Sequence, residues 1–97
     1  MEIKQLKVLL QKSFVIGLDL NSGTGFKWHV NSDENFVKLL DERTNSPSNK
    51  PGSTYLCEFE FYTLQEGKTL LEFMLKRTWE QTPTQKIIYE LEILSSP

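Results

Sequence analysis

The 97-residue sequence predicts an all-β protein, specifically an antiparallel β-sandwich. Apolar and polar residues alternate in several short segments, which is the pattern of a strand with one face in a core and the other toward water. Segments rich in turn-forming residues separate these alternations, among them "NSGTG", "LQEGK" and "TWEQTPTQ". Short strands with frequent turn signals are typical of sandwiches.

The alternations place the strands in order along the chain. We expect strands at residues 6–10, 14–20, 26–30, 56–62, 69–77 and 85–94. Residues 35–41, within "ENFVKLLDER", fit a strand or a single helical turn equally well. The first alternation leaves open whether it pairs within one chain or between two, and we expect a monomer.

The composition limits the classes of function. With 38% hydrophobic and 25% charged residues, the chain resembles an ordinary globular protein, and its length suits one domain over residues 1–97. The net charge is −2 and the eleven Lys and Arg residues are scattered, which argues against a nucleic-acid partner. No apolar run is long enough to span a membrane, so no membrane partner is expected.

The N-terminal segment bears on localisation, and the cysteine content bears on disulfides and metal sites. The apolar core of "MEIKQLKVLLQKSF" is too short for a signal peptide, so we expect a cytoplasmic protein or a form lacking its leader. Cys57 is the only cysteine, which permits no internal disulfide and no cysteine-based zinc site. We expect no metal and no cofactor.

Catalytic residues are hard to find in this sequence. A cysteine–histidine nucleophile pair would require Cys57 and His29, the only histidine. Cys57 shares a strand face with Phe59 and Phe61, so we expect it in the core. His29 alternates with Trp28, and we expect it on the outer face, in solvent, with Trp28 in the core. Evenly spaced carboxylates fit polar strand faces better than acid–base pairs: Glu58, Glu60, Glu90 and Glu92. An enzyme is therefore not expected.

The connections between strands remain as candidates for function. In an antiparallel sandwich, alternate connections lie at the same end of the molecule. The connections at residues 21–25, 42–55 and 78–84 are the first, third and fifth along the chain from residue 14, so they should cluster at one tip. Functional residues of sandwiches are commonly located on such clustered loops.

Motifs on these loops resemble those of the chagasin family of cysteine-protease inhibitors. "LNSGTGFKW" is similar to the family's N-P-T-T-G-[FY]-x-W motif, and "LKRTWE" is similar to its R-P-W motif. "KPGST" lies where the family has a G-x-G-G loop, and the resemblance covers roughly residues 6–94. The matching residues are Asn21, Thr24, Gly25, Phe26, Trp28, Arg77 and Trp79. Ser22, Gly23 and Thr78 depart from the motifs, and only Gly52 remains of the glycine cluster.

The resemblance implies an immunoglobulin-like β-sandwich that plugs the active-site cleft of papain-like cysteine proteases. Residues 1–97 would form one chagasin-like inhibitor domain, and residues 21–25 would cover the catalytic cysteine. Residues 48–54 and the loop at 78–84, with Arg77 before it, would grip the cleft on either side. The implied protease-binding residues are Asn21, Ser22, Gly23, Thr24, Gly25, Pro51, Gly52, Ser53, Arg77, Thr78 and Trp79.

Other interpretations stay open at this point. The glycines at the first loop also suit a hairpin turn with positive φ and no partner. The same loops would serve an immunoglobulin-like binding module with a non-protease partner, whereas a structural domain of a larger assembly would pack Trp79 inward. Arg77 fits either a protease contact or a role in fixing the last loop. Losing two prolines, at positions 22 and 78, would weaken inhibition by about 1–2 kcal/mol.

Overall fold

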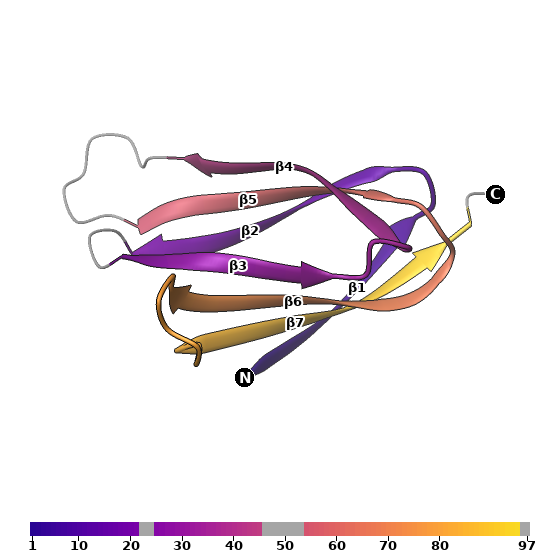
Figure 1. Cartoon of the computed structure of the whole chain (residues 1–97). Coiled ribbons are helices and arrows are strands. Elements are labelled where there is room, and N and C mark those ends of the chain that lie inside the picture. The colour runs from indigo at the N-terminus through magenta and orange to yellow at the C-terminus, as the bar shows by residue number, and fades with distance from the viewer. Residues whose placement is uncertain (22–24, 46–53, 96–97) are drawn as a thin grey trace.

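The protein, here a computed structural model that describes residues 1–21, 25–45 and 54–95, folds into two packed β-sheets (Figure 1). The strands are β1 (Glu2–Leu9), β2 (Ser13–Asn21), β3 (Phe26–Ser32), β4 (Val37–Asn45), β5 (Thr54–Thr63), β6 (Gly67–Arg77) and β7 (Gln85–Leu94). One sheet has the order β1-β7-β6-β3 and the other the order β2-β5-β4. The predicted all-β sandwich is confirmed. Within the described ranges, no helix has the length and apolar character to cross a bilayer.

One strand pairing differs from the antiparallel expectation. β1 runs parallel to β7, from Glu2 opposite Ile87 to Leu9 opposite Leu94, while the other pairings are antiparallel. The expectation was wrong here because the chain reverses direction at each connection, so the odd-numbered strands all run the same way. Among the described strands, β1 and β7 are the one neighbouring pair in which both strands are odd-numbered. The pairing also shows that the first alternation pairs within the chain.

The core lies between the sheets and follows the alternation. Phe59 and Phe61 of β5 both contact Phe73 of β6 edge to face, with ring centroids 5.2 and 6.4 Å apart. These three rings join the two sheets, and burying each contributes about 2–3 kcal/mol. Cys57 and Trp28 are each only 5% exposed and belong to the same core, as the sequence predicts.

At the end of the sandwich where β1 leads into β2, one buried hydroxyl holds three segments together. Among the described residues, Thr63 is the one buried polar side chain, and its hydroxyl donates to the carbonyl of Leu9 at 2.7 Å. The backbone amide of Lys12 donates to the same hydroxyl at 3.1 Å. Thr63 therefore ties β5 to the turn at Gln11, whose φ is positive at 58°.

The segment that fitted a strand or a helical turn contains both in succession. The amides of Phe36 and Val37 donate to the carbonyl of Asp33 at 3.0 and 3.2 Å, which makes one turn, and β4 then begins. β4 continues past a bulge between Leu39 and Asp41 to Asn45. The expected connection 42–55 is therefore too long, because its first and last residues pair in the β4–β5 ladder.

Candidate functional site

The strand ends meet at one end of the sandwich as predicted. β2, β4 and β6 end there, and β3, β5 and β7 begin there (Figure 1). Asn21 pairs with Thr54, and Phe26 pairs with Arg77. We call this end the tip and define it by residues 21, 25–26, 45, 54 and 77–84. Antiparallel strand directions alone produce this gathering, since each connection returns the chain to the same end.

The predicted protease-binding residues divide into two groups. Those that lie outside the described residues are Ser22, Gly23, Thr24, Pro51, Gly52 and Ser53. The described ones all lie at the tip: Asn21 ends β2, Gly25 precedes β3, Arg77 ends β6, and Thr78 and Trp79 form the following turn. Their position at one end is as expected, and their contact with a protease stays a prediction.

Trp79 is exposed over 73% of its surface. It lies beside Gly25, because a Cβ built on that glycine would be 3.5 Å from Trp79 Cη2. Two connections far apart in sequence therefore touch at the tip. Gly25 has a φ of +79°, a conformation that L-residues with a side chain adopt only with strain. The predicted need for positive φ is thus confirmed at Gly25, and the inward packing of Trp79 is not observed.

Arg77 links the two aromatic residues of the tip. Its guanidinium carbon is 4.6 Å from the ring centroid of Phe26 and 5.9 Å from that of Trp79. A guanidinium over an aromatic face is attracted by the ring quadrupole, by about 0.5–1 kcal/mol at exposed sites. The antiparallel register creates the arrangement, since Phe26 is the direct cross-strand partner of Arg77. Arg77 thus helps to fix the last loop, one of the two roles left open by the sequence.

Glu80 closes the turn that carries Trp79. Its backbone amide donates to the carbonyl of Arg77 at 3.0 Å, and its carboxylate accepts from the amide of Arg77 at 3.2 Å. Both bonds restrain the four-residue turn with Thr78 and Trp79 at its centre. Sequence reasoning missed Glu80, although a carboxylate three residues after the end of a strand is the available signal.

Trp28 supports the tip from inside. Its indole nitrogen donates to the carbonyl of Asp19 at 2.9 Å. This bond crosses from β3 to β2, which belong to different sheets and are joined by residues 22–25. A buried Trp needs such a partner for its N–H. Trp28 therefore fixes the spacing of the two strands that lead into the first loop.

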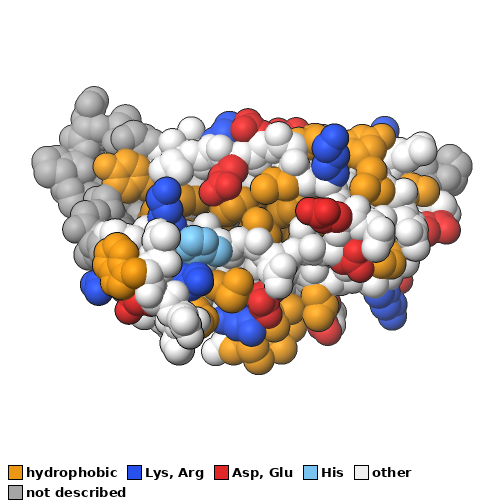
Figure 2. Space-filling view, in the orientation of Figure 1, with side chains coloured by type: hydrophobic (Ala, Val, Ile, Leu, Met, Phe, Trp, Pro, Cys, Tyr) orange, Lys and Arg blue, Asp and Glu red, His pale blue; other side chains and the backbone are white. Residues whose placement is uncertain are grey.

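The two residues considered for a thiol nucleophile pair do not meet. Cys57 is buried on the inner face of β5, where its sulfur is 3.9 Å from the hydroxyl oxygen of Thr44. His29 lies on the outer face of the opposite sheet, directly across from Met74 (Figure 2). The expectation of a solvated histidine was wrong in part, because the residue is half-buried and its Nε2 atom is enclosed. That atom is buried without a hydrogen-bond partner among the described residues.

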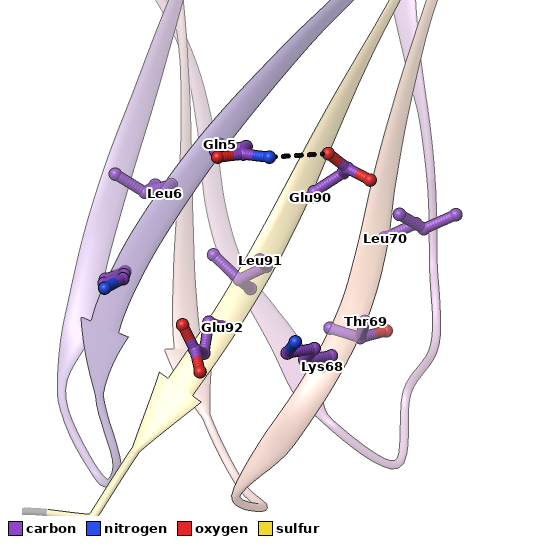
Figure 3. A pocket seen from close by; sticks show the side chains of 9 residues that line it. Gln5, Leu6, Lys68, Thr69, Leu70, Glu90, Leu91 and Glu92 are labelled. Atoms are coloured by element: carbon purple, nitrogen blue, oxygen red, sulfur yellow. Dashed lines mark hydrogen bonds between the residues drawn. The ribbon is translucent and has the colours of Figure 1, made fainter.

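The described surface also contains a groove of about 610 Å³ across β1, β7 and β6 (Figure 3). Its polar wall includes Gln5, whose amide donates to Glu90 at 3.2 Å. The groove includes Lys68 and Leu70 at the start of β6, so it lies away from the tip. Within the described ranges, no group of three or more His, Cys, Asp or Glu residues could hold a metal ion.

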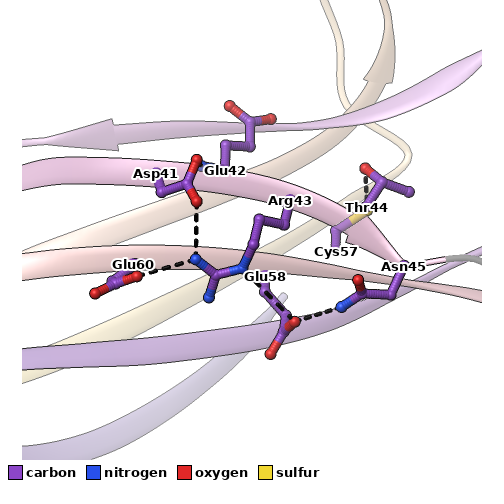
Figure 4. Close-up of polar contacts among 8 residues, drawn as sticks. All are labelled: Asp41, Glu42, Arg43, Thr44, Asn45, Cys57, Glu58 and Glu60. Carbon is purple, nitrogen blue, oxygen red and sulfur yellow. Dashed lines mark hydrogen bonds and ion pairs between the residues drawn. The ribbon is translucent and has the colours of Figure 1, made fainter.

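The carboxylates of β5 face solvent in an ion-pair network rather than as an acid–base pair (Figure 4). Arg43 Nη1 is 2.9 Å from both Asp41 and Glu60, and its Nε is 4.0 Å from Glu58, which also accepts from Asn45. The hydrogen bond from Arg43 holds the pKa of Asp41 below its ordinary value. The bond to Glu60 likewise raises the pKa of Arg43. The interpretation of these carboxylates as outer-face residues is confirmed.

The fold and the tip define a class of protein: a β-sandwich that presents an exposed aromatic residue at one end. The chain belongs to the chagasin family of peptidase inhibitors, since the family model described as "Chagasin family peptidase inhibitor I42" matches residues 7–93. The resemblance seen in the motifs is confirmed, and the family is one of inhibitors, not enzymes.

Solved structures share the fold at low sequence identity. The cysteine protease inhibitor EhICP2 from Entamoeba histolytica is similar with a TM-score of 0.77 and 20% identity, over 95% of this chain and 96% of that one. Amebosin follows with a TM-score of 0.69 and 15% identity, over 99% of each chain. A chain in the structure of PbICP-C in complex with falcipain-2 is similar with a TM-score of 0.60 and 16% identity, over 98% of this chain and 88% of that one. No curated protein sequence matches the chain.

Proposed function

We propose that the protein inhibits papain-like cysteine proteases, acting as a single chain whose residues 1–97 form one inhibitor domain. The tip enters the active-site cleft. Residues 21–25 meet the catalytic cysteine, residues 48–54 lie along one side of the cleft, and Arg77, Thr78 and Trp79 lie along the other. Membership of the chagasin family supports this proposal, as does the similar fold of a chain solved with falcipain-2.

The observation that carries the proposal is the exposure of Trp79 over 73% of its surface. The indole lies in a turn and is in contact with water, which is unfavourable for an apolar surface. Binding of a partner with an apolar surface would remove it from water and lower the free energy. Covering it contributes about 2–3 kcal/mol. The turn is already fixed by Glu80 and by the stacking of Arg77, so little conformational entropy is lost on binding.

Replacing Trp79 with alanine tests the proposal. Trp79→Ala should raise the inhibition constant by about 30- to 150-fold, the equivalent of about 2–3 kcal/mol, against a panel of papain-like proteases. The free energy of unfolding should fall by no more than about 1 kcal/mol, because the side chain is mostly exposed and the contact with Arg77 is lost. Inhibition constants and thermal unfolding curves give the two readouts.

Leu70→Ala is the matched control, since Leu70 is also exposed and apolar, at 54%, but lies at the opposite end of β6. It should leave inhibition unchanged. If the wild-type protein in excess inhibits none of the panel, the proposal is wrong, and a binding module with a non-protease partner becomes the favoured interpretation. Equal losses from both variants would contradict the role given to the tip.

A further inference from the structure

Two lysines face each other across β3 and β6 next to the tip. Lys27 is the direct cross-strand partner of Lys76 on the outer face of the sheet. His29 follows Lys27 on the same face, and Figure 2 shows Lys and Arg side chains on two sides of the single histidine. We call Lys27 and Lys76 the basic pair.

The basic pair is an exception on this face of the sheet. Elsewhere the register sets opposite charges together: Glu92 of β7 lies between Lys7 of β1 and Lys68 of β6. Glu72, which follows on β6, is paired with Lys86 at 2.9 Å. Like charges directly opposite one another in a sheet are destabilising.

Nothing in the described part of the chain neutralises the basic pair. Neither Lys27 nor Lys76 forms an ion pair among the described residues. The carboxylate of Glu80, close by in sequence, accepts a hydrogen bond from the amide of Arg77 instead. The strands therefore hold two positive charges close together. Their repulsion destabilises the fold, and no ion pair among the described residues offsets it.

The two lysines of the basic pair lie next to the tip, where a bound partner could neutralise their charge. Lys76 directly precedes Arg77, and Lys27 comes two residues after Gly25, so each lysine lies within about 10 Å of chain from the tip. That span is close to the Debye length of about 8 Å at physiological salt. Charges at the edge of a binding surface act mainly on the rate of association and on partner choice.

We infer that the basic pair contacts carboxylates on the rim of the target's cleft, and that it selects proteases with an acidic rim. The inference rests on the proposed function and adds the charge of the partner to it. The protein as a whole carries a net charge of −2, so attraction must come from a local patch. The outer face of β4 and β5 is rich in carboxylates, so a partner with an acidic rim would be repelled by that face.

Lys76→Glu tests the inference through two readouts that move in opposite directions. The association rate constant with a protease that the wild type inhibits should fall about tenfold at about 50 mM NaCl. The difference should shrink below about twofold at about 500 mM NaCl, where the Debye length is only about 4 Å. The melting temperature should rise, because a carboxylate would then face Lys27. A purely structural role would change only the melting temperature.

Lys38→Glu is the control for net charge. Lys38 is exposed near the start of β4, at the end away from the tip, opposite Tyr62 rather than a charged residue. It changes the net charge by the same amount and should leave the association rate within about twofold of the wild type.

Each outcome separates the inference from the proposed function. If the wild type inhibits but Lys76→Glu associates at the same rate, or if both variants slow equally, the inference is wrong and the proposed function stands. If the wild type inhibits no protease, both are wrong. Binding of the wild type, but not of Lys76→Glu, to phosphatidylserine vesicles, with unchanged inhibition, would assign the pair to an anionic lipid surface and overturn the inference.

Discussion

The two tryptophans of this chain differ in where their side chains lie, one in the core and the other in solvent. Trp28 is 5% exposed, and its N–H is bonded to the carbonyl of Asp19, whereas Trp79 is 73% exposed. One fixes the two strands that enter the first loop, and the other offers apolar surface at the last loop. Trp28 therefore supports the fold, whereas the proposed function gives Trp79 the contact with the target. Each of these roles has its own measurable consequence.

Trp28→Phe should destabilise the fold by about 1–3 kcal/mol. The smaller ring leaves unfilled volume, and the carbonyl of Asp19 loses its donor. Chemical denaturation of both proteins measures the difference in unfolding free energy. Trp79→Phe is the control and should unfold like the wild type, since Trp79 is mostly exposed. An unchanged free energy for Trp28→Phe would show that the bond to Asp19 contributes nothing.

At the scale of elements, the ladder between β4 and β5 is reinforced by one guanidinium. Arg43 bridges Asp41 on its own strand and Glu60 on the neighbouring strand. The pKa of Asp41 is lowered in the folded state, so the pair adds stability above the ordinary pKa of about 3.8 and loses it as the pH falls through the lowered value. Arg43 stays charged throughout this range, as a guanidinium does in proteins.

Asp41→Asn should therefore lower the melting temperature at neutral pH and have no effect in strong acid. The gap between variant and wild type should close as the pH falls through the lowered pKa of Asp41, because the wild-type carboxyl is then protonated too. The gap at neutral pH should be small and should shrink with salt, since the pair is exposed. Thermal unfolding from pH 2 to 7 measures it. A gap that persists undiminished at pH 2 contradicts the ion-pair explanation.

The strands could be predicted from local periodicity, but their partners could not. Alternation assigns Phe59 and Phe61 to the core because side chains on a strand repeat with a period of two. It contains no information on which distant strand lies alongside, so the parallel pairing of β1 with β7 went unpredicted. It also fails at a bulge, which shifts the phase at Leu39 and Asp41 and hides the second half of β4.

At the scale of the whole molecule, the gathering of the loops could be predicted, and their contacts could not. Counting connections from β2 onward places the three loops at one end whatever their length. The contacts of Arg77 with Phe26 and Trp79 depend on the exact register of β3 against β6, which no local pattern defines. The burial of His29 Nε2 likewise depends on tertiary packing, which the alternation along β3 does not define.

The proposed function leads to a last prediction for the molecule as a whole. Inhibition should be competitive with a small peptide substrate: the apparent KM rises with inhibitor concentration while kcat stays constant, since substrate and tip need the same space. The inhibitor should also remain uncut after long incubation, because the β-sandwich holds the loops on both sides and resists the extended conformation of a substrate. Initial rates across a substrate series and mass spectrometry of the recovered chain test both points. A fall in kcat at saturating substrate would place the tip outside the cleft, and a cleaved chain would make the protein a slow substrate instead.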